Sequence, residues 1–198
     1  MAYDKFEILT SSAVPLPIEN VDTDQIIPAR FLKATERKGF GDNLFRDWRF
    51  NGDDTPKQDF VLNDDTYSGK ILVGGKNFGS GSSREHAAWA VYDYGFRCVI
   101  SSFFADIFKN NCLNIGVLPV QVSPEFAAKI FAAIEADPKT EIEVNLPEQT
   151  VTILSTGDKE SFEINGYKKG NMLNGYDDID YLSNMRDNIK IFAQDLPL

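Results

Sequence analysis

The chain has 198 residues, of which 30 are acidic and 20 are basic, and its formal net charge at pH 7 is −10. This length suits one domain with a sizeable hydrophobic core. No cluster of lysine or arginine offsets the negative charge, which argues against a nucleic-acid partner because phosphate binding needs a basic face. A small anionic ligand is compatible with this charge only at a locally positive site.

The N-terminal segment MAYDKFEILTSSAVPLPIEN has neither the basic start nor the unbroken apolar stretch of a secretory signal. No later segment has the run of about 20 apolar residues that a membrane-spanning helix needs. We therefore expect a cytoplasmic protein without a membrane partner.

The first polar stretch along the chain is ENVDTDQIIPARFLK, at residues 19–33. Asp22 and Asp24 alternate as in a calcium loop, but the third acidic position and the obligatory glycine are missing. The stretch can be a turn in which aspartate and threonine bond to nearby backbone N–H groups. Alternatively, Asp24 orients a cation such as Arg84 or a reacting hydroxyl. The spacing leaves both hypotheses open.

A parallel crossover unit is predicted over residues 69–102. GKILVGG and FRCVISS contain short apolar runs that are typical of buried strands, and HAAWAVYDY between them is typical of a helix that ends at Gly95. The glycine-rich loop GGKNFGSGSSREH, residues 74–86, then lies at the carboxyl end of the first strand.

An anion site is predicted at Gly79 to Arg84. A helix start leaves backbone N–H groups without partners and carries partial positive charge, and Arg84 adds a planar fork of donors suited to a carboxylate or phosphate. Ser82 and Glu85 have the spacing of a capping box, which would place Ser82 at the helix boundary. A simple cap remains the alternative hypothesis for Ser82.

Three familiar motifs do not fit this loop. A dinucleotide-binding fingerprint needs glycine where Arg84 stands, a P-loop needs glycine, lysine and then serine or threonine, and a nucleophile elbow needs glycine two residues on each side of the serine. His86, the single histidine, lies one turn after Ser82 and could act as a base. Without an elbow, helix packing or hydrogen bonding on the substrate side is the preferred hypothesis for it.

The two cysteines, Cys98 and Cys112, have no metal-ligand spacing and are expected to be buried apolar side chains. They are too few for an iron–sulfur cluster, which takes about three or four thiolates. The sequence therefore predicts no metal ligands.

Further elements follow in chain order. FFADIFKNNCLNIG predicts a helix that ends near Gly116, and VLPVQV predicts a strand. Ser123 and Pro124 are typical of the start of a third helix, PEFAAKIFAAIEA.

The C-terminal part is expected to contain a hairpin and a closing helix. EIEVNLPEQTVTIL alternates polar and apolar residues about a turn. DDIDYLSNMRDNIKIF, at residues 177–192, has the period of an amphipathic helix. Its predicted buried residues are Ile179, Leu182, Ile189 and Phe192.

NVDTDQIIPARFLK and GKNFGSGSSREHAAWAV together resemble the small subunit of the isopropylmalate isomerase (3-isopropylmalate dehydratase) family. The same domain resembles the swivel domain of aconitase, and DWRF at 47–50 and NNCLNIG at 110–116 extend the likeness. The resemblance implies an α/β fold: an aconitase-like swivelling β/β/α domain with a mixed, largely parallel core sheet flanked by helices. Residues 1–198 would form one such domain, with about 140–198 as an extension.

In that family, a 4Fe-4S cluster is held by a separate large subunit, and the small subunit binds no cofactor and completes the active site. The resemblance implies a hydro-lyase of leucine biosynthesis that converts 2-isopropylmalate to 3-isopropylmalate. Two alternatives stay open. One is the small subunit of a related enzyme for a hydroxy-diacid of the methylmalate/citraconate or homoaconitate type, and the other is a non-catalytic module that binds an organic anion.

The family motif places the catalytic serine at Ser82, and Asp24 is carried over as a second catalytic residue. The substrate-binding residues implied are Ser83, Arg84, Thr23, Gly79 and Gly81. An alcohol is a very weak base, so its alkoxide needs the helix start, nearby cations and the exclusion of water.

The segment after the early motif is expected to shape the pocket that recognises the isopropyl group. Its residues are Arg30, Phe31, Leu32 and Lys33. Aconitase has another substrate-binding arginine downstream of the early aspartate, but the spacing from Asp24 to Arg30 does not reproduce it, which leaves substrate choice open.

Overall fold

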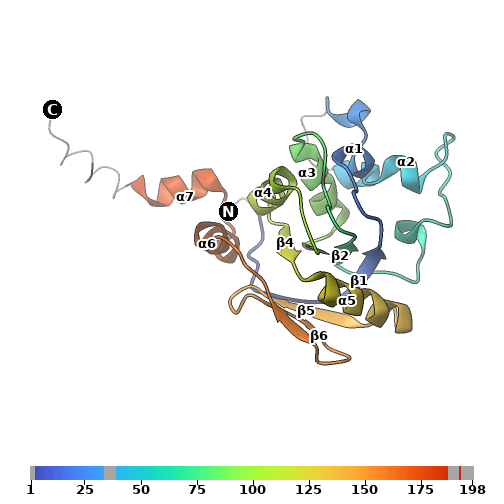
Figure 1. Cartoon of the computed structure of the whole chain (residues 1–198). Coiled ribbons are helices and arrows are strands. Elements are labelled where there is room, and N and C mark those ends of the chain that lie inside the picture. Colours follow the sequence, from blue (N-terminus) through green and yellow to red (C-terminus); the bar gives the residue numbers. More distant parts are fainter. Residues whose placement is uncertain (1–2, 34–38, 187–191, 193–198) are drawn as a thin grey trace.

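The computed structural model describes residues 3–33, 39–186 and 192 (Figure 1). Seven strands form one sheet in the order β4-β3-β2-β1-β5-β6-β7. Their bounds are β1 Ile8–Leu16, β2 Ile71–Gly74, β3 Cys98–Ser101, β4 Leu118–Gln121, β5 Glu141–Asn145, β6 Thr150–Ile153 and β7 Lys159–Ser161.

Strand β1 joins a parallel half of the sheet to an antiparallel half. Its second part, Ala13–Leu16, pairs in parallel with β2, and β2, β3 and β4 continue in parallel. Its first part, Ile8–Ser12, pairs antiparallel with β5, which β6 and β7 follow as antiparallel neighbours. The predicted mixed sheet and the predicted hairpin over 141–154 are confirmed.

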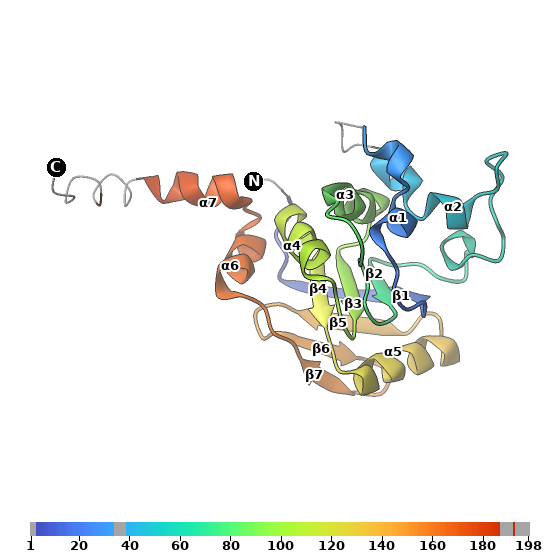
Figure 2. The ribbon, with the colours of Figure 1, turned by 45° about the horizontal axis from the view of Figure 1, so that its top comes forward.

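Helices cover both faces of the parallel half (Figure 2). The helices are α1 Thr23–Ile26, α2 Arg46–Arg49, α3 Glu85–Tyr94, α4 Asp106–Ile115, α5 Pro124–Ala136, α6 Gly166–Asn174 and α7 Asp178–Asn184. Successive residues of a strand point to opposite faces. Accordingly, Ile71 and Val73 pack in the cluster that contains α5, and Leu72 packs in the cluster that contains α3 and α4. Burial on both faces explains the unbroken apolar runs of these strands.

The predicted helix boundaries are largely confirmed. Gly95 and Gly116 follow the ends of α3 and α4 in the left-handed conformation, with φ of 118° and 87°. At the start of α5, the Ser123 hydroxyl accepts a hydrogen bond from the Phe126 N–H at 3.1 Å, and Pro124 is the first helical residue.

The prediction that the closing helix buries its apolar residues is wrong for the described part. Ile179, Leu182 and Phe192 are 74%, 56% and 67% exposed, and Ile189 lies outside the described residues. Helix α7 runs away from the sheet beyond α6 (Figures 1 and 2). A hydrogen bond from the Tyr167 hydroxyl in α6 to the Asp178 carboxylate joins the two helices. A helical period identifies an apolar face but not what packs against it.

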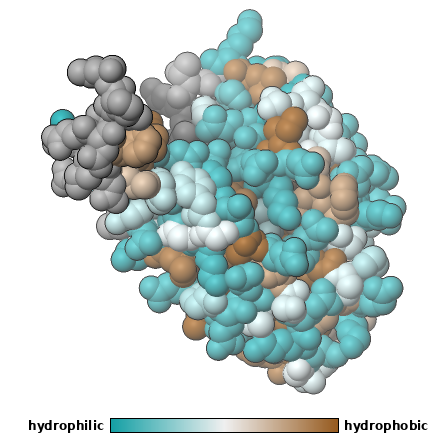
Figure 3. Space-filling view, turned by 60° about the vertical axis from the view of Figure 1, so that its left-hand side comes forward, coloured by the Kyte–Doolittle hydropathy of each residue, from teal (hydrophilic) through white to brown (hydrophobic). Residues whose placement is uncertain are grey.

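The rest of the surface is mainly hydrophilic on the side shown in Figure 3, where hydrophobic residues form small separate groups. None of the helices that the structure describes is long and apolar enough to cross a membrane. The division of the chain into a domain and an extension from about residue 140 stays a prediction.

Candidate active site

The two polar stretches of the sequence lie side by side in the structure. Asp22 and Ser80 form an isolated parallel bridge. The backbone N–H groups of Gly79 and Ser80 donate to the carbonyl of Val21 at 2.8 and 3.1 Å, and the N–H of Thr23 donates to the Ser80 carbonyl at 2.8 Å. These contacts join segments nearly 60 residues apart in the chain.

The sheet topology explains this meeting. Strands β1 and β2 are parallel neighbours with Leu16 opposite Gly74, so both polar stretches leave the same edge of the sheet. The carboxyl edge of parallel strands is where open α/β sheets commonly bind ligands.

Gly79 lets the loop pass close to α4. Its φ is +77°, and a Cβ atom at this position would lie 2.2 Å from Cγ of Phe108. Any larger residue would therefore be strained in its backbone and would clash with the Phe108 ring. Sequence reasoning missed Phe108 as a support of this loop, because no local pattern signals such a contact.

Asp22 and Asp24 divide the two roles that the sequence left open. Asp22 caps α1: its carboxylate accepts from the Gln25 N–H at 2.8 Å, and the Gln25 side chain accepts from the Asp22 N–H at 2.8 Å. Asp24 instead forms an ion pair with Arg84, whose side chain is only 13% exposed. The predicted turn is therefore present at Asp22, and the predicted orientation of Arg84 by Asp24 is present as well.

The predicted capping box at Ser82 is wrong. Helix α3 begins at Glu85, Arg84 occupies the N-cap position with φ −135° and ψ 102°, and no side chain caps this end. The physical reason is tertiary: the carbonyl of Ser82 accepts a hydrogen bond from the Thr23 hydroxyl at 3.0 Å, and the chain stays non-helical through Arg84. Ser82 and Ser83 are exposed as a result of this course of the loop.

His86 lies in an aromatic cluster. Its ring centroid is 4.4 Å from that of Trp89 and 5.6 Å from that of Phe40. The half-buried imidazole therefore packs on the helix surface, as preferred from the sequence.

The segment 30–33, which is expected to shape the pocket for the isopropyl group, contacts the DWRF motif through Arg30. Arg30 binds Asp47 of the DWRF motif through a hydrogen bond and an ion pair, and its guanidinium lies 4.7 Å from the centroid of the Phe31 ring. Phe31 and Leu32 are partly buried, whereas Lys33 is exposed. The hydrogen bond from Arg30 lowers the pKa of the Asp47 carboxyl.

Both cysteines are buried, as predicted, and burial raises the pKa of each thiol. Among the described residues, no group of three or more histidine, cysteine, aspartate or glutamate side chains could hold a metal ion.

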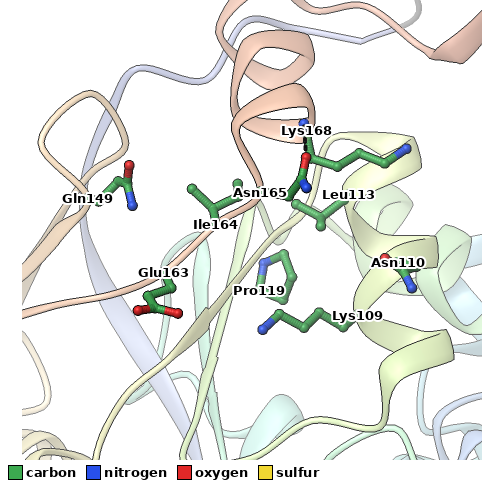
Figure 4. A pocket seen from close by; sticks show the side chains of 9 residues that line it. All are labelled: Lys109, Asn110, Leu113, Pro119, Gln149, Glu163, Ile164, Asn165 and Lys168. Carbon is green, nitrogen blue, oxygen red and sulfur yellow. Dashed lines mark hydrogen bonds between the residues drawn. The ribbon is translucent and has the colours of Figure 1, made fainter.

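A separate pocket of about 460 Å³ lies between α4 and the start of α6 (Figure 4). Lys109 and Lys168 line it together with Glu163, so its charge is mixed. None of the site residues predicted from the sequence lines this pocket, and the candidate site remains the junction of residues 21–24 and 79–84.

The fold and this junction are those of an aconitase-type C-terminal domain. The family model described as "Aconitase C-terminal domain" matches residues 3–125, and a second model, described as LeuD_N, matches residues 128–166.

Similar proteins narrow the class further. The 3-isopropylmalate dehydratase small subunit of Christiangramia forsetii is 60% identical over 191 residues, which cover 96% of this chain and 93% of that protein. The protein of the same name from Cytophaga hutchinsonii is 61% identical, with 96% and 95% covered. The crystal structure of 3-isopropylmalate dehydratase (LeuD) from Methanocaldococcus jannaschii matches with a TM-score of 0.68 at 25% identity, covering 94% of this chain and 99% of that one. The chain belongs to the family of 3-isopropylmalate dehydratase small subunits, as the sequence predicted.

Proposed function

We propose that this chain is the small subunit of a 3-isopropylmalate dehydratase, a hydro-lyase of leucine biosynthesis, and that its Gly79–Arg84 loop completes the active site. The observation that supports the site most directly is the exposure of Ser82 and Ser83 beside the Asp24–Arg84 ion pair at the carboxyl edge of the sheet. An exposed serine held next to an oriented guanidinium suits a site that closes only when a second subunit covers it.

The reaction removes water from 2-isopropylmalate and adds it back the other way round. In the first step, Ser82 as an alkoxide takes the proton from the carbon beside a carboxylate. The C–H electron pair then forms the double bond, and the hydroxyl leaves with the C–O pair as hydroxide. In the second step, hydroxide adds to the carbon that lost the proton. Ser82 gives its proton to the carbon that lost the hydroxyl, which gives 3-isopropylmalate and restores the alkoxide.

The charge that develops on the substrate carboxylate needs a fixed cation. The fork of donors on Arg84 suits a carboxylate, and its ion pair with Asp24 holds it in place before substrate arrives. Ser83 and the exposed backbone at Gly81 are the other proposed substrate contacts. Gly79 differs from them because it is buried and its N–H donates to the Val21 carbonyl, so we propose that it shapes the loop. Thr23 is also buried, at only 2% exposed.

The partner in this proposal is a large subunit that carries the 4Fe-4S cluster. Cys98 and Cys112 are both buried, so this chain offers no cysteine set for the cluster. When bound to the large subunit, the cluster would supply a Lewis acid for the substrate hydroxyl. We also propose that the substrate is a small diacid, that neither nucleic acid nor a membrane is bound, and that the enzyme is cytoplasmic.

The test is to titrate this chain into a cluster-loaded large subunit and to measure isomerisation of 2-isopropylmalate, with Ser82→Ala alongside. We expect turnover only with both chains present, and a Ser82→Ala variant that associates normally but is inactive. Association without turnover of isopropylmalate would make another hydroxy-diacid the substrate. Full activity of the Ser82→Ala variant would exclude Ser82 as the base.

A further inference from the structure

Thr23 touches the candidate loop at two points. Its backbone N–H donates to the Ser80 carbonyl at 2.8 Å, and its hydroxyl donates to the Ser82 carbonyl at 3.0 Å. Between these points, Gly81 lies against Thr23. A Cβ atom built on Gly81 would be 3.4 Å from Oγ1 of Thr23. The backbone of Ser80 to Ser82 therefore runs directly across this one threonine.

Thr23 is itself firmly held. It is the first residue of α1, whose start is fixed by the reciprocal hydrogen bonds of Asp22 and Gln25. Its carbonyl accepts a hydrogen bond from the N–H of Ile27 at 3.0 Å, and Ile26 and Ile27 are fully buried. The hydroxyl thus projects from a supported element toward a loop that lacks secondary structure between Gly81 and Arg84.

The burial of Thr23 separates it from the exposed serines. Thr23 is 2% exposed, and its hydroxyl donates to a carbonyl of the protein itself. We propose that Thr23 is a positioning residue: it fixes the backbone of Ser82, and so the place of the Ser82 hydroxyl, without contacting the substrate. This inference rests on the proposed role of Ser82 as the base, and it replaces the substrate contact that the resemblance implies for Thr23.

Three variants test the proposal in the full chain. Thr23→Val keeps the side-chain shape and removes the donor, whereas Thr23→Ser keeps the donor. Thr140→Val is the matched control, because Thr140 is also buried, at 5% exposed, and its hydroxyl donates to a backbone carbonyl, that of Ala133, at 3.3 Å. Thr140 lies just before β5, outside the candidate site.

The first readout is kinetic, with a saturating large subunit. We expect Thr23→Val to lower kcat by about tenfold to a hundredfold, because a small displacement of a catalytic group is costly, with KM changed less than about twofold. Thr23→Ser should have most of the wild-type kcat, and Thr140→Val should have the full wild-type kcat. A higher KM at an unchanged kcat would overturn the proposal in favour of substrate contact. Equal losses in Thr23→Val and Thr23→Ser would also overturn it.

The second readout needs no activity. Amide hydrogen exchange of the isolated chain should be about three- to tenfold faster at Gly79, Ser80 and position 23 in Thr23→Val, as expected for the loss of one partly buried hydrogen bond, and unchanged in Thr23→Ser. Unchanged exchange in Thr23→Val would overturn the proposed contact. If the wild-type chain gave no isomerisation while exchange responded as expected, the proposed function would fail and the support of the loop by Thr23 would stand.

Discussion

Asp24 forms an ion pair with Arg84, 60 residues later in the chain, and the pair ties α1 to the residue that precedes α3. Asp24 is 54% exposed at its side chain, so the pair stabilises the fold only weakly. Its larger effect is to orient the guanidinium of Arg84, which directly follows the two exposed serines in the chain.

We therefore predict that Asp24→Asn lowers kcat/KM for 2-isopropylmalate by about tenfold, because Arg84 loses the partner that orients it. The free energy of unfolding should change by less than about 1 kcal/mol. Asp54→Asn is the control, since Asp54 forms a similarly exposed ion pair with Arg46 outside the loop. Equal kcat/KM values for both variants would remove Asp24 from the catalytic machinery.

Gly79→Ala should destabilise the chain by about 2 kcal/mol or more, through its left-handed backbone and the clash with Phe108. Gly157→Ala tests the backbone cost alone, because Gly157 has φ +76° and an added Cβ would meet nothing within 4 Å. This control should cost only about 1 kcal/mol. Denaturant unfolding of the isolated chain measures both, and equal losses would show that the approach to Phe108 does not require glycine.

Leu32→Lys should reduce the preference for isopropylmalate over a polar homologous diacid by about tenfold if the 30–33 segment shapes the side-chain pocket. The ratio of kcat/KM values for the two diacids is the measurement. Leu154→Lys serves as the control because Leu154 is 46% exposed and follows β6, away from this segment. A ratio unchanged by Leu32→Lys would place the specificity pocket elsewhere.

The pKa of Asp47 is lowered chiefly by the hydrogen bond from Arg30. A carboxyl with a lowered folded-state pKa contributes stability above its unfolded value, near 4, and that contribution is lost as the pH falls through the folded pKa. We expect Arg30→Gln to raise the Asp47 pKa toward its ordinary value, as followed by NMR titration of the carboxyl carbon. Because Asp47 is 60% exposed, the change in stability should stay below about 1 kcal/mol. An unmoved titration would show that Arg30 is not its partner in solution.

The sequence by itself determined the local structure and the family. Gly95, Gly116 and Ser123 end or begin helices through their own backbone preferences or side chains, and the alternation of residues 141–154 specifies a hairpin. Such signals depend on neighbours within a few residues, so they can be read from a single chain. The two motifs around residues 24 and 84 could likewise be recognised from the sequence alone, and they identified the family.

Only the tertiary structure decided where the loop residues stand. The spacing of Ser82 and Glu85 is correct for a capping box, yet Ser82 is not the cap, because its carbonyl is bound by Thr23 from a segment nearly 60 residues earlier. The period of α7 is helical, yet Ile179 is exposed because the helix leaves the body of the domain. Both outcomes depend on contacts between distant segments, whose geometry no local pattern contains.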